Sequence, residues 1–233
     1  MSPYKLLSLL LDYPDAELLA LRPEVAAAVA EVPAAEIREP LERFLASEAE
    51  RSAVDLQTAY VATFDFDRRA SLHLTYFVHG DRRQRGVALL KLKRLFAAME
   101  LELATDELPD HLPLLLELAD IAGPEAGAEV LREFRPAIEL IGARLREQES
   151  PYAEVLGALS WLLGPVTDET LESILHLAAQ GPPEEQVGLE PFAPPETMGM
   201  LSPSSACAPG EPAPLTQTTS MDATVAAAPG GTR

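Results

Sequence analysis

The chain opens with leucines spaced for one face of a helix. They recur three and four positions apart between residues 6 and 11, the spacing that an amphipathic helix requires. Ser2 followed by Pro3 is typical of a helix start, because serine caps the first turn and proline fits its backbone. Since Pro14 disfavours a continuing helix, we predict that the first helix ends near Tyr13.

Helical spacing of apolar residues continues to Gln180. It predicts further helices at about 15–21, 23–32, 34–49, from Ser52 past Phe64, and at 81–100, 124–148, 151–163 and 167–179, the last capped by Thr167 or Asp168. In the 124–148 segment the apolar stripe leaves Arg135 outside. There is no series of runs rich in Val, Ile, Thr and aromatics, which strands need. The expected fold is therefore all-α, a single-domain compact helical bundle of about eight to ten helices.

The composition changes after Gln180. Gly, Pro, Ser, Thr and Ala dominate the rest of the chain, together with scattered acidic residues. Such a segment cannot bury enough apolar surface to offset the conformational entropy lost on folding. We predict a helical domain over 1–180 and a disordered, acidic, Pro-rich tail over 181–233. The apolar residues between Leu189 and Leu201 are either a short docking motif or isolated residues of a kind common in tails.

Charge narrows the range of partners. The chain has 18 basic and 37 acidic residues and a net charge of −19, which repels nucleic-acid phosphates and anionic lipids and favours basic partners. The single cysteine, Cys207, cannot form an internal disulfide. No apolar stretch approaches the roughly 20 residues that cross a bilayer, and the N-terminal apolar run is not typical of a secretory signal. We expect a cytoplasmic protein that neither binds nucleic acid nor inserts into a membrane.

Candidate catalytic and metal-binding residues form no recognisable site. His73, His79, Asp81 and His111 lie near one another in the sequence, but no Cys pair or His-Glu-x-x-His spacing accompanies them. Capping, packing or surface roles therefore fit these residues better than zinc binding. A nucleophile elbow, a Walker A loop and a dinucleotide-binding glycine loop are all missing from the sequence. The sequence thus predicts a binding protein with no catalytic site, metal or cofactor.

Basic residues are concentrated in one segment. Eight of the 18 lie between residues 68 and 94, where Asp81 is the only acidic residue: Arg68, Arg69, Arg82, Arg83, Arg85, Lys91, Lys93 and Arg94. This segment neutralises acidic helices of the same chain, is simply solvated, or binds nucleic acid. The last interpretation is the weakest, because no aromatic residues alternate with the charges to stack on bases.

The most specific local pattern is ELPDHLPLLLELADI, residues 107–121. Pro109 and Pro113 predict a turn followed by a helix, and Asp110 is placed to cap the amides that follow it. Two interpretations fit this pattern equally. It is a loop that fixes the start of a helix, or it is one end of a groove where Glu107 and Asp110 offer carboxylates to an incoming Arg or Lys.

Two motifs together resemble a known family. The first motif is YVATFDFDRRASLHLTYFVHGDRRQRG, Tyr60 to Gly86, and the second motif is ELPDHLPLLLEL, Glu107 to Leu118. With the opening YKLLSLLLDYPDAEL, they resemble the nitrate reductase delta-subunit (NarJ-type) molybdenum cofactor assembly chaperones, within the wider group of molybdoenzyme-specific chaperones. The resemblance covers residues 3 to 180, and the two motifs in this order are far more specific than either alone.

The resemblance implies a system-specific assembly chaperone. Such a protein binds the N-terminal peptide of the apo catalytic (alpha) subunit of respiratory nitrate reductase, permits insertion of the molybdenum cofactor before membrane attachment, and is not part of the final enzyme. Transferred to this sequence, the suspected peptide-binding residues of the first motif are Phe64, Asp65, Arg68, Ser71, Leu72, His73, Gly80, Asp81 and Arg82. Those of the second motif are Glu107, Leu108, Pro109, Asp110, His111 and Pro113.

Two other functions stay open. A chaperone of another molybdoenzyme, such as dimethyl sulfoxide or trimethylamine N-oxide reductase, would share the fold, although the run FDFDRRASLHL favours the nitrate reductase branch. A helical hydrolase would need carboxylates that converge in a pocket, and no Glu-x-x-Glu motifs on facing helices are apparent. Peptide binding requires a cleft between helices that is apolar along its floor and negatively charged at its mouth.

Overall fold

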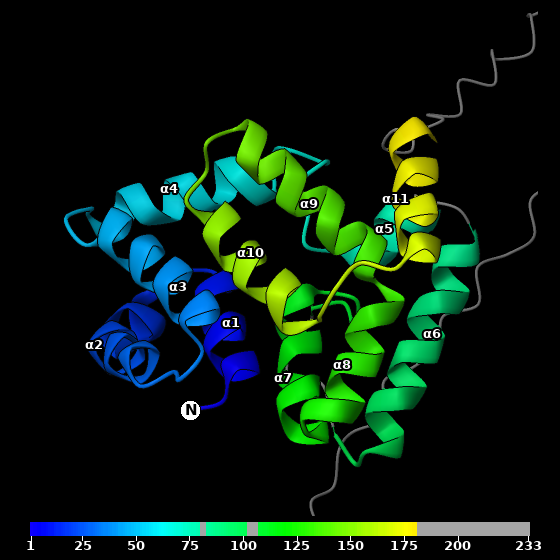
Figure 1. The fold of residues 1–233 in the computed structure, drawn as a ribbon, viewed down its shortest axis with the longest axis horizontal. Helices are drawn as coiled ribbons and strands as arrows, with labels where there is room; N and C mark the ends of the chain where they lie inside the picture. The colour runs from blue at the N-terminus through cyan, green and yellow to red at the C-terminus, as the bar shows by residue number, and fades with distance from the viewer. Residues whose placement is uncertain (80–82, 102–106, 181–233) are drawn as a thin grey trace, which may run out of the picture. The chain divides into compact units, whose positions relative to one another are not determined.

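The structure, a computed structural model, describes residues 1–79, 83–101 and 107–180. In these ranges it contains eleven α-helices and, apart from one isolated β-bridge, no strand, which confirms the predicted all-α fold (Figure 1). The helices are α1 (Pro3–Leu11), α2 (Ala16–Ala30), α3 (Ala35–Glu48), α4 (Ala53–Phe64), α5 (Leu74–His79), α6 (Arg83–Ala98), α7 (Leu112–Ala122), α8 (Pro124–Glu133), α9 (Arg135–Glu147), α10 (Tyr152–Leu162) and α11 (Asp168–Gln180). None of them combines the length and the apolar character that crossing a membrane requires.

Some sequence predictions fall outside the described residues. They are those that concern Gly80, Asp81, Arg82, Cys207 and the tail at 181–233. The division into a helical domain and a tail therefore stays a prediction.

Several helices begin at the capping residues that the sequence indicates. The Ser2 hydroxyl accepts a backbone amide of the first turn of α1 at 3.1 Å. Ser52 accepts the amide of Asp55 at 3.2 Å and donates to its carboxylate at 2.7 Å, so these two residues form the predicted start of α4. The Thr167 hydroxyl accepts the amide of Thr170 at 3.2 Å, which identifies Thr167 as the cap of α11.

Pro23 does not divide the second helical segment. Where the sequence predicted two helices, at 15–21 and 23–32, α2 is one helix that contains Pro23. Proline has a helical φ and removes only one backbone donor, and Pro23 is exposed, so its ring displaces no core side chain. The prediction of a break was wrong for this reason.

The segment 124–148, predicted as one helix, forms two. α8 ends at Glu133 and α9 begins at Arg135, with Phe134 between them at φ −100° and ψ 7°. Pro136 lies in the first turn of α9, where its missing amide has no helical partner to lose, but it cannot continue α8. The apolar stripe continues across this break because both helices pack on the same core.

Arg135 is buried, although the sequence predicted it outside the apolar stripe. It is 4% exposed, and its guanidinium donates to the Glu139 carboxylate at 2.6 Å and to the carbonyls of Ser160 at 3.0 Å and Gly164 at 2.9 Å. A buried arginine is tolerated when its charge and its donors are matched in this way. These hydrogen bonds connect the end of α10 to the start of α9.

The core joins helices that are far apart in the sequence. α1 packs on α7 and α10, α10 packs on α3 and α9, and α7 packs on α8 (Figure 1). Leu6 and Leu7 of α1 and Leu115 and Leu116 of α7 are completely buried. Each such side chain contributes about 1.5–3 kcal/mol through burial. This packing holds α7, and with it the second motif, in a fixed position.

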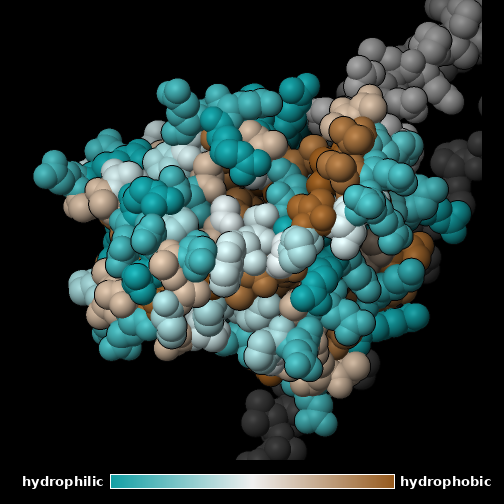
Figure 2. All heavy atoms as spheres, viewed as in Figure 1, coloured by the Kyte–Doolittle hydropathy of each residue, from teal (hydrophilic) through white to brown (hydrophobic). Residues whose placement is uncertain are grey.

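α11 is the least buried helix of the described chain. It packs on α9, but none of its described side chains is buried, and Leu171 and Leu175 of its predicted apolar face are 50% and 62% exposed. Figure 2 shows apolar residues gathered on the surface where α11 lies. The apolar spacing that predicted this helix therefore does not place it in the core.

Candidate functional site

The two motifs meet in the structure through their backbones. The amide of Leu112 donates to the carbonyl of Leu72 at 2.9 Å, and the amide of Leu74 donates to the carbonyl of Asp110 at 3.1 Å. These two hydrogen bonds form one antiparallel β-bridge, the only strand-like pairing among the described residues. The secondary structure of the first motif differs from the prediction. The helix expected to continue past Phe64 ends there as α4, and the short helix α5 was not predicted.

The Asp110 side chain is the centre of this junction. It is 0% exposed, and its carboxylate accepts hydrogen bonds from the amide of Thr75, at 3.2 Å, and from the Thr75 hydroxyl. Nδ1 of His73 lies 3.3 Å from Oδ1 of Asp110, and the Arg85 guanidinium lies 3.7 Å from Oδ2, the oxygen that accepts from Thr75. Asp110 therefore caps α5, not the following helix as predicted; the N-cap of α7 is His111, which makes no side-chain cap bond.

Asp110 stays ionised in this environment. Burial alone would raise its pKa, but the hydrogen bonds from His73 and Thr75, with the charges of His73 and Arg85, hold the pKa below its usual range. A buried carboxylate with these partners is not available to an incoming peptide. The structure thus argues against a direct peptide contact by Asp110, whereas the side chain of Glu107 is 43% exposed and lies 3.5 Å from Nε2 of His73.

His111 lies beside this junction and carries no charge near neutral pH. Burial, with the nearby His73, lowers the pKa of His111 to about 4, although Glu107 opposes the shift. The unfolded chain takes up this proton near pH 6.5 and the folded chain only near pH 4, so the unfolded state binds more protons between these values.

We therefore expect stability to fall as the pH is lowered from 6.5 to about 4, by up to about 3 kcal/mol. Urea unfolding across this range measures the slope. His111→Gln should flatten it, whereas His176→Gln, at an exposed position of α11, should leave it as in the wild type. An equally steep slope in His111→Gln would show that another group is responsible.

A polar pocket of about 310 Å³ opens in front of the junction. Its lining consists of Phe64, Asp65, Arg68, Ser71, His73, Tyr76 and Arg85. The first five of these are suspected peptide-binding residues, so the structure brings together a large part of the first motif. The other two, Tyr76 and Arg85, were not predicted. Arg85 belongs to the basic segment noted in the sequence, and its guanidinium lies 5.7 Å from the centre of the Tyr76 ring, within the range of a cation–π contact.

Of the remaining suspected residues, those that the structure describes do not line this pocket. Leu72, Pro109 and Pro113 are buried and contribute to packing. Leu108 and His111 are half-buried beside them. Leu72 joins the two motifs through its carbonyl, which accepts the amide of Leu112.

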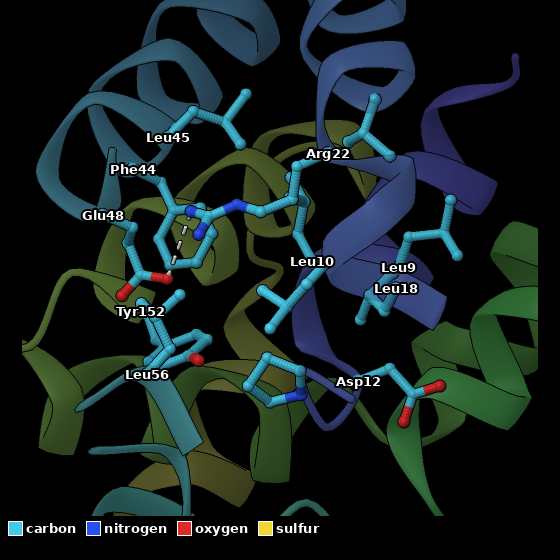
Figure 3. A pocket seen from close by; sticks show the side chains of 13 residues that line it. Leu9, Leu10, Asp12, Leu18, Arg22, Phe44, Leu45, Glu48, Leu56 and Tyr152 are labelled. Carbon is cyan, nitrogen blue, oxygen red and sulfur yellow. Dashed lines mark ion pairs between the residues drawn. The ribbon is translucent and has the colours of Figure 1, made fainter. Parts of the chain in front are cut away.

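A second pocket has the chemistry expected of the predicted cleft (Figure 3). It lies among α1, α2, α3, α4 and α10, and its lining is mostly apolar: Leu9, Leu10, Asp12, Pro14, Leu18, Leu19, Arg22, Val25, Phe44, Leu45, Glu48, Leu56 and Tyr152. Two carboxylates, Asp12 and Glu48, interrupt the apolar surface. The open space is only about 30 Å³, enough for one water molecule. Sequence analysis identified none of these residues as candidates.

The described residues hold no group of three or more His, Cys, Asp or Glu side chains that could bind a metal ion. The His73 and His111 rings are close, with centroids 5.2 Å apart, but Asp110 is already matched by its intramolecular partners.

Comparisons with known proteins agree with the resemblance of the two motifs. The sequence model of the family described as "Nitrate reductase delta subunit" matches residues 29–157. The probable nitrate reductase molybdenum cofactor assembly chaperone NarJ of Bacillus subtilis (strain 168) is 38% identical over 156 residues, 67% of this chain and 85% of that protein. The nitrate reductase molybdenum cofactor assembly chaperone NarJ of Escherichia coli (strain K12) is 36% identical over 185 residues, 77% of this chain and 78% of that protein.

A further relative comes from the same bacterium. The probable nitrate reductase molybdenum cofactor assembly chaperone NarW of Escherichia coli (strain K12) is 33% identical over 164 residues, 70% of this chain and 69% of that protein. The family match at 29–157 includes both motifs in full. The chain therefore belongs to the nitrate reductase delta subunit family.

Proposed function

We propose that this chain is a dedicated assembly chaperone of respiratory nitrate reductase. It binds the N-terminal peptide of the apo catalytic subunit, permits insertion of the molybdenum cofactor before membrane attachment, and leaves the finished enzyme. The observation that carries this proposal is the polar pocket at the junction of the two motifs, in a chain whose relatives are named as assembly chaperones. The proposed setting is the cytoplasm, where the apo subunit is made.

The pocket offers the groups that a peptide's leading end needs. Arg68 and Ser71 supply donors for backbone carbonyls, and Asp65 supplies a carboxylate for a basic side chain or an amino terminus. Glu107 is not part of the lining, but its carboxylate lies 3.5 Å from Nε2 of His73 and can serve the same groups from beside the pocket. The rings of Phe64 and Tyr76 give apolar surface beside these polar groups. In this proposal Asp110, Leu72 and the prolines of the second motif position the contact residues and do not touch the peptide.

The net charge of −19 supports the same kind of partner. A strongly acidic protein attracts basic peptides at long range and is repelled by nucleic acid and anionic membranes. Partners that carry a basic leading segment are therefore favoured over phosphate-bearing ones.

Titration calorimetry with a synthetic N-terminal peptide of the catalytic subunit tests the proposal. We expect Arg68→Ala and Glu107→Gln each to weaken binding by about 5-fold to 30-fold, the effect of losing one charge-assisted hydrogen bond. Arg43→Ala is the matched control, since Arg43 is exposed on α3 and pairs with Glu154 at 2.8 Å, outside the pocket.

Two results would count against this proposal. One is an affinity in the Arg68 and Glu107 variants equal to that of the Arg43 variant, which would place the peptide elsewhere. The other is that a dimethyl sulfoxide reductase leader peptide binds more tightly than the nitrate reductase peptide, which would make dimethyl sulfoxide reductase the client.

A further inference from the structure

α2 covers the apolar pocket but is only weakly packed. Of its fifteen residues, only Val25 and Val29 are buried, and Leu21 is 41% exposed. Pro23 removes one hydrogen bond from the middle of the helix. Helices with little buried apolar surface open at low free-energy cost compared with core helices.

The segments that flank α2 are anchored to neighbouring helices. Before the helix, the Pro14 carbonyl accepts the side-chain amide of Gln57 at 3.0 Å. After it, the Val32 carbonyl accepts the Arg38 guanidinium at 2.9 Å, and Val32 itself is 5% exposed. An opening of α2 would therefore pivot about anchored ends and need not unfold its neighbours.

One ion pair joins the middle of α2 to the floor of the pocket (Figure 3). Glu48 of α3 has a side chain only 6% exposed, and one of its oxygens accepts a hydrogen bond from Arg51 at 3.2 Å. The other oxygen lies 3.7 Å from the Arg22 guanidinium, which is too long for a hydrogen bond. Burial raises the pKa of Glu48, although the charges of Arg51 and Arg22 oppose the shift. The buried carboxylate is thus paired with two arginines but accepts a hydrogen bond from only one of them, Arg51.

We propose that α2 is a displaceable lid, and that the pocket beneath it binds the apolar face of a helix carrying one Arg or Lys, whose cation pairs with Glu48. The inference rests on the proposed function, because the occupant is the N-terminal peptide of the client. In the closed state α2 imitates that occupant: Leu18, Arg22 and Val25 are spaced for one helix face and line the pocket.

Charge and volume favour this occupant. The space under the closed lid holds about one water molecule, so a small ligand does not fit unless α2 moves. Glu48, Asp12 and the net charge of the chain disfavour an anion. An amphipathic helix with a basic residue fills the apolar lining and completes the pairing of the carboxylate.

The two pockets are close enough to serve one peptide. The rings of Phe64, which lines the polar pocket, and Tyr152, which lines the apolar one, are 4.8 Å apart between centroids. A lining residue of one pocket is therefore in contact with a lining residue of the other.

Calorimetry with the client peptide tests the inference with two variants whose affinities should change in opposite directions. Arg22→Ala removes the side chain that takes the place of the peptide's cation in the closed state. The fraction of molecules with an open lid should then rise, and peptide affinity should increase about threefold to tenfold. Glu48→Gln should weaken binding at least about tenfold. The Glu48→Gln effect should disappear for a peptide whose basic residues are replaced by glutamine. Arg43→Ala serves again as the control with unchanged affinity.

Hydrogen exchange of the wild-type protein gives a second readout that needs no variant. Peptide binding should speed exchange of the α2 amides, and slower exchange there would overturn the inference. Wild-type binding with unchanged affinities in Arg22→Ala and Glu48→Gln would also overturn it and leave the proposed function intact. Failure of the wild-type protein to bind the peptide would instead refute the proposed function.

Discussion

Replacing Asp110 by alanine is expected to lower the free energy of unfolding by about 3–5 kcal/mol. The variant leaves Arg85 without its buried counter-charge and removes the cap of α5 at Thr75. For a domain of this size the melting temperature should fall by about 10 °C. Because the same carboxylate positions His73, peptide affinity should fall as well.

Two comparisons make this prediction specific. Glu129→Ala, at an exposed position of α8, should change stability by no more than about 0.5 kcal/mol. Asp110→Asn keeps the shape of the side chain and loses its charge, so its loss in free energy of unfolding should lie between those of Asp110→Ala and Glu129→Ala. If urea unfolding finds Asp110→Ala as stable as Glu129→Ala, then Asp110 does not hold the motifs together.

Gly127→Ala is expected to destabilise the protein by about 3 kcal/mol. α7 and α8 approach so closely that a Cβ at Gly127 would lie 2.5 Å from the carbonyl oxygen of Ala119 and 2.6 Å from its Cα. These are backbone atoms, so the two helices must separate to accommodate one methyl group. Since α7 carries the second motif, the separation should also disturb the candidate site.

The matched control, Gly86→Ala, should change the free energy of unfolding in the opposite direction. Gly86 is exposed on α6, and a Cβ added there would meet no described atom within 4 Å, so Gly86→Ala should raise the free energy of unfolding by about 0.5–1 kcal/mol. Thermal unfolding of both variants measures the contrast. A neutral Gly127→Ala would mean that α7 and α8 are not packed as closely as described.

Apolar spacing and caps were sufficient to predict the fold class and most helices. Helix starts at Ser2, Ser52 and Thr167 depend on local hydrogen bonds, which the sequence contains. Two of the errors in helix boundaries arose where proline has a context-dependent effect. Pro23 is tolerated inside α2, whereas Pro136 begins a new helix, and only packing distinguishes the two cases.

The candidate site was predictable in part. The motif residues that line the polar pocket are close in sequence, so the family resemblance of the first motif indicated Asp65, Arg68 and His73 together. The partner of Asp110 was not predictable, because Thr75 precedes it by 35 residues and the contact depends on the packing of α7. Likewise, the pairing of Glu48 with Arg22 joins two helices whose faces the sequence left undetermined.

The most direct test of the account uses the apo catalytic subunit of nitrate reductase with and without its N-terminal peptide. Binding of each form to the full chain is measured by calorimetry at the same salt concentration. The account predicts that the complete apo subunit binds and that the form without the peptide binds at least about tenfold more weakly. Equal affinity for both forms would contradict it.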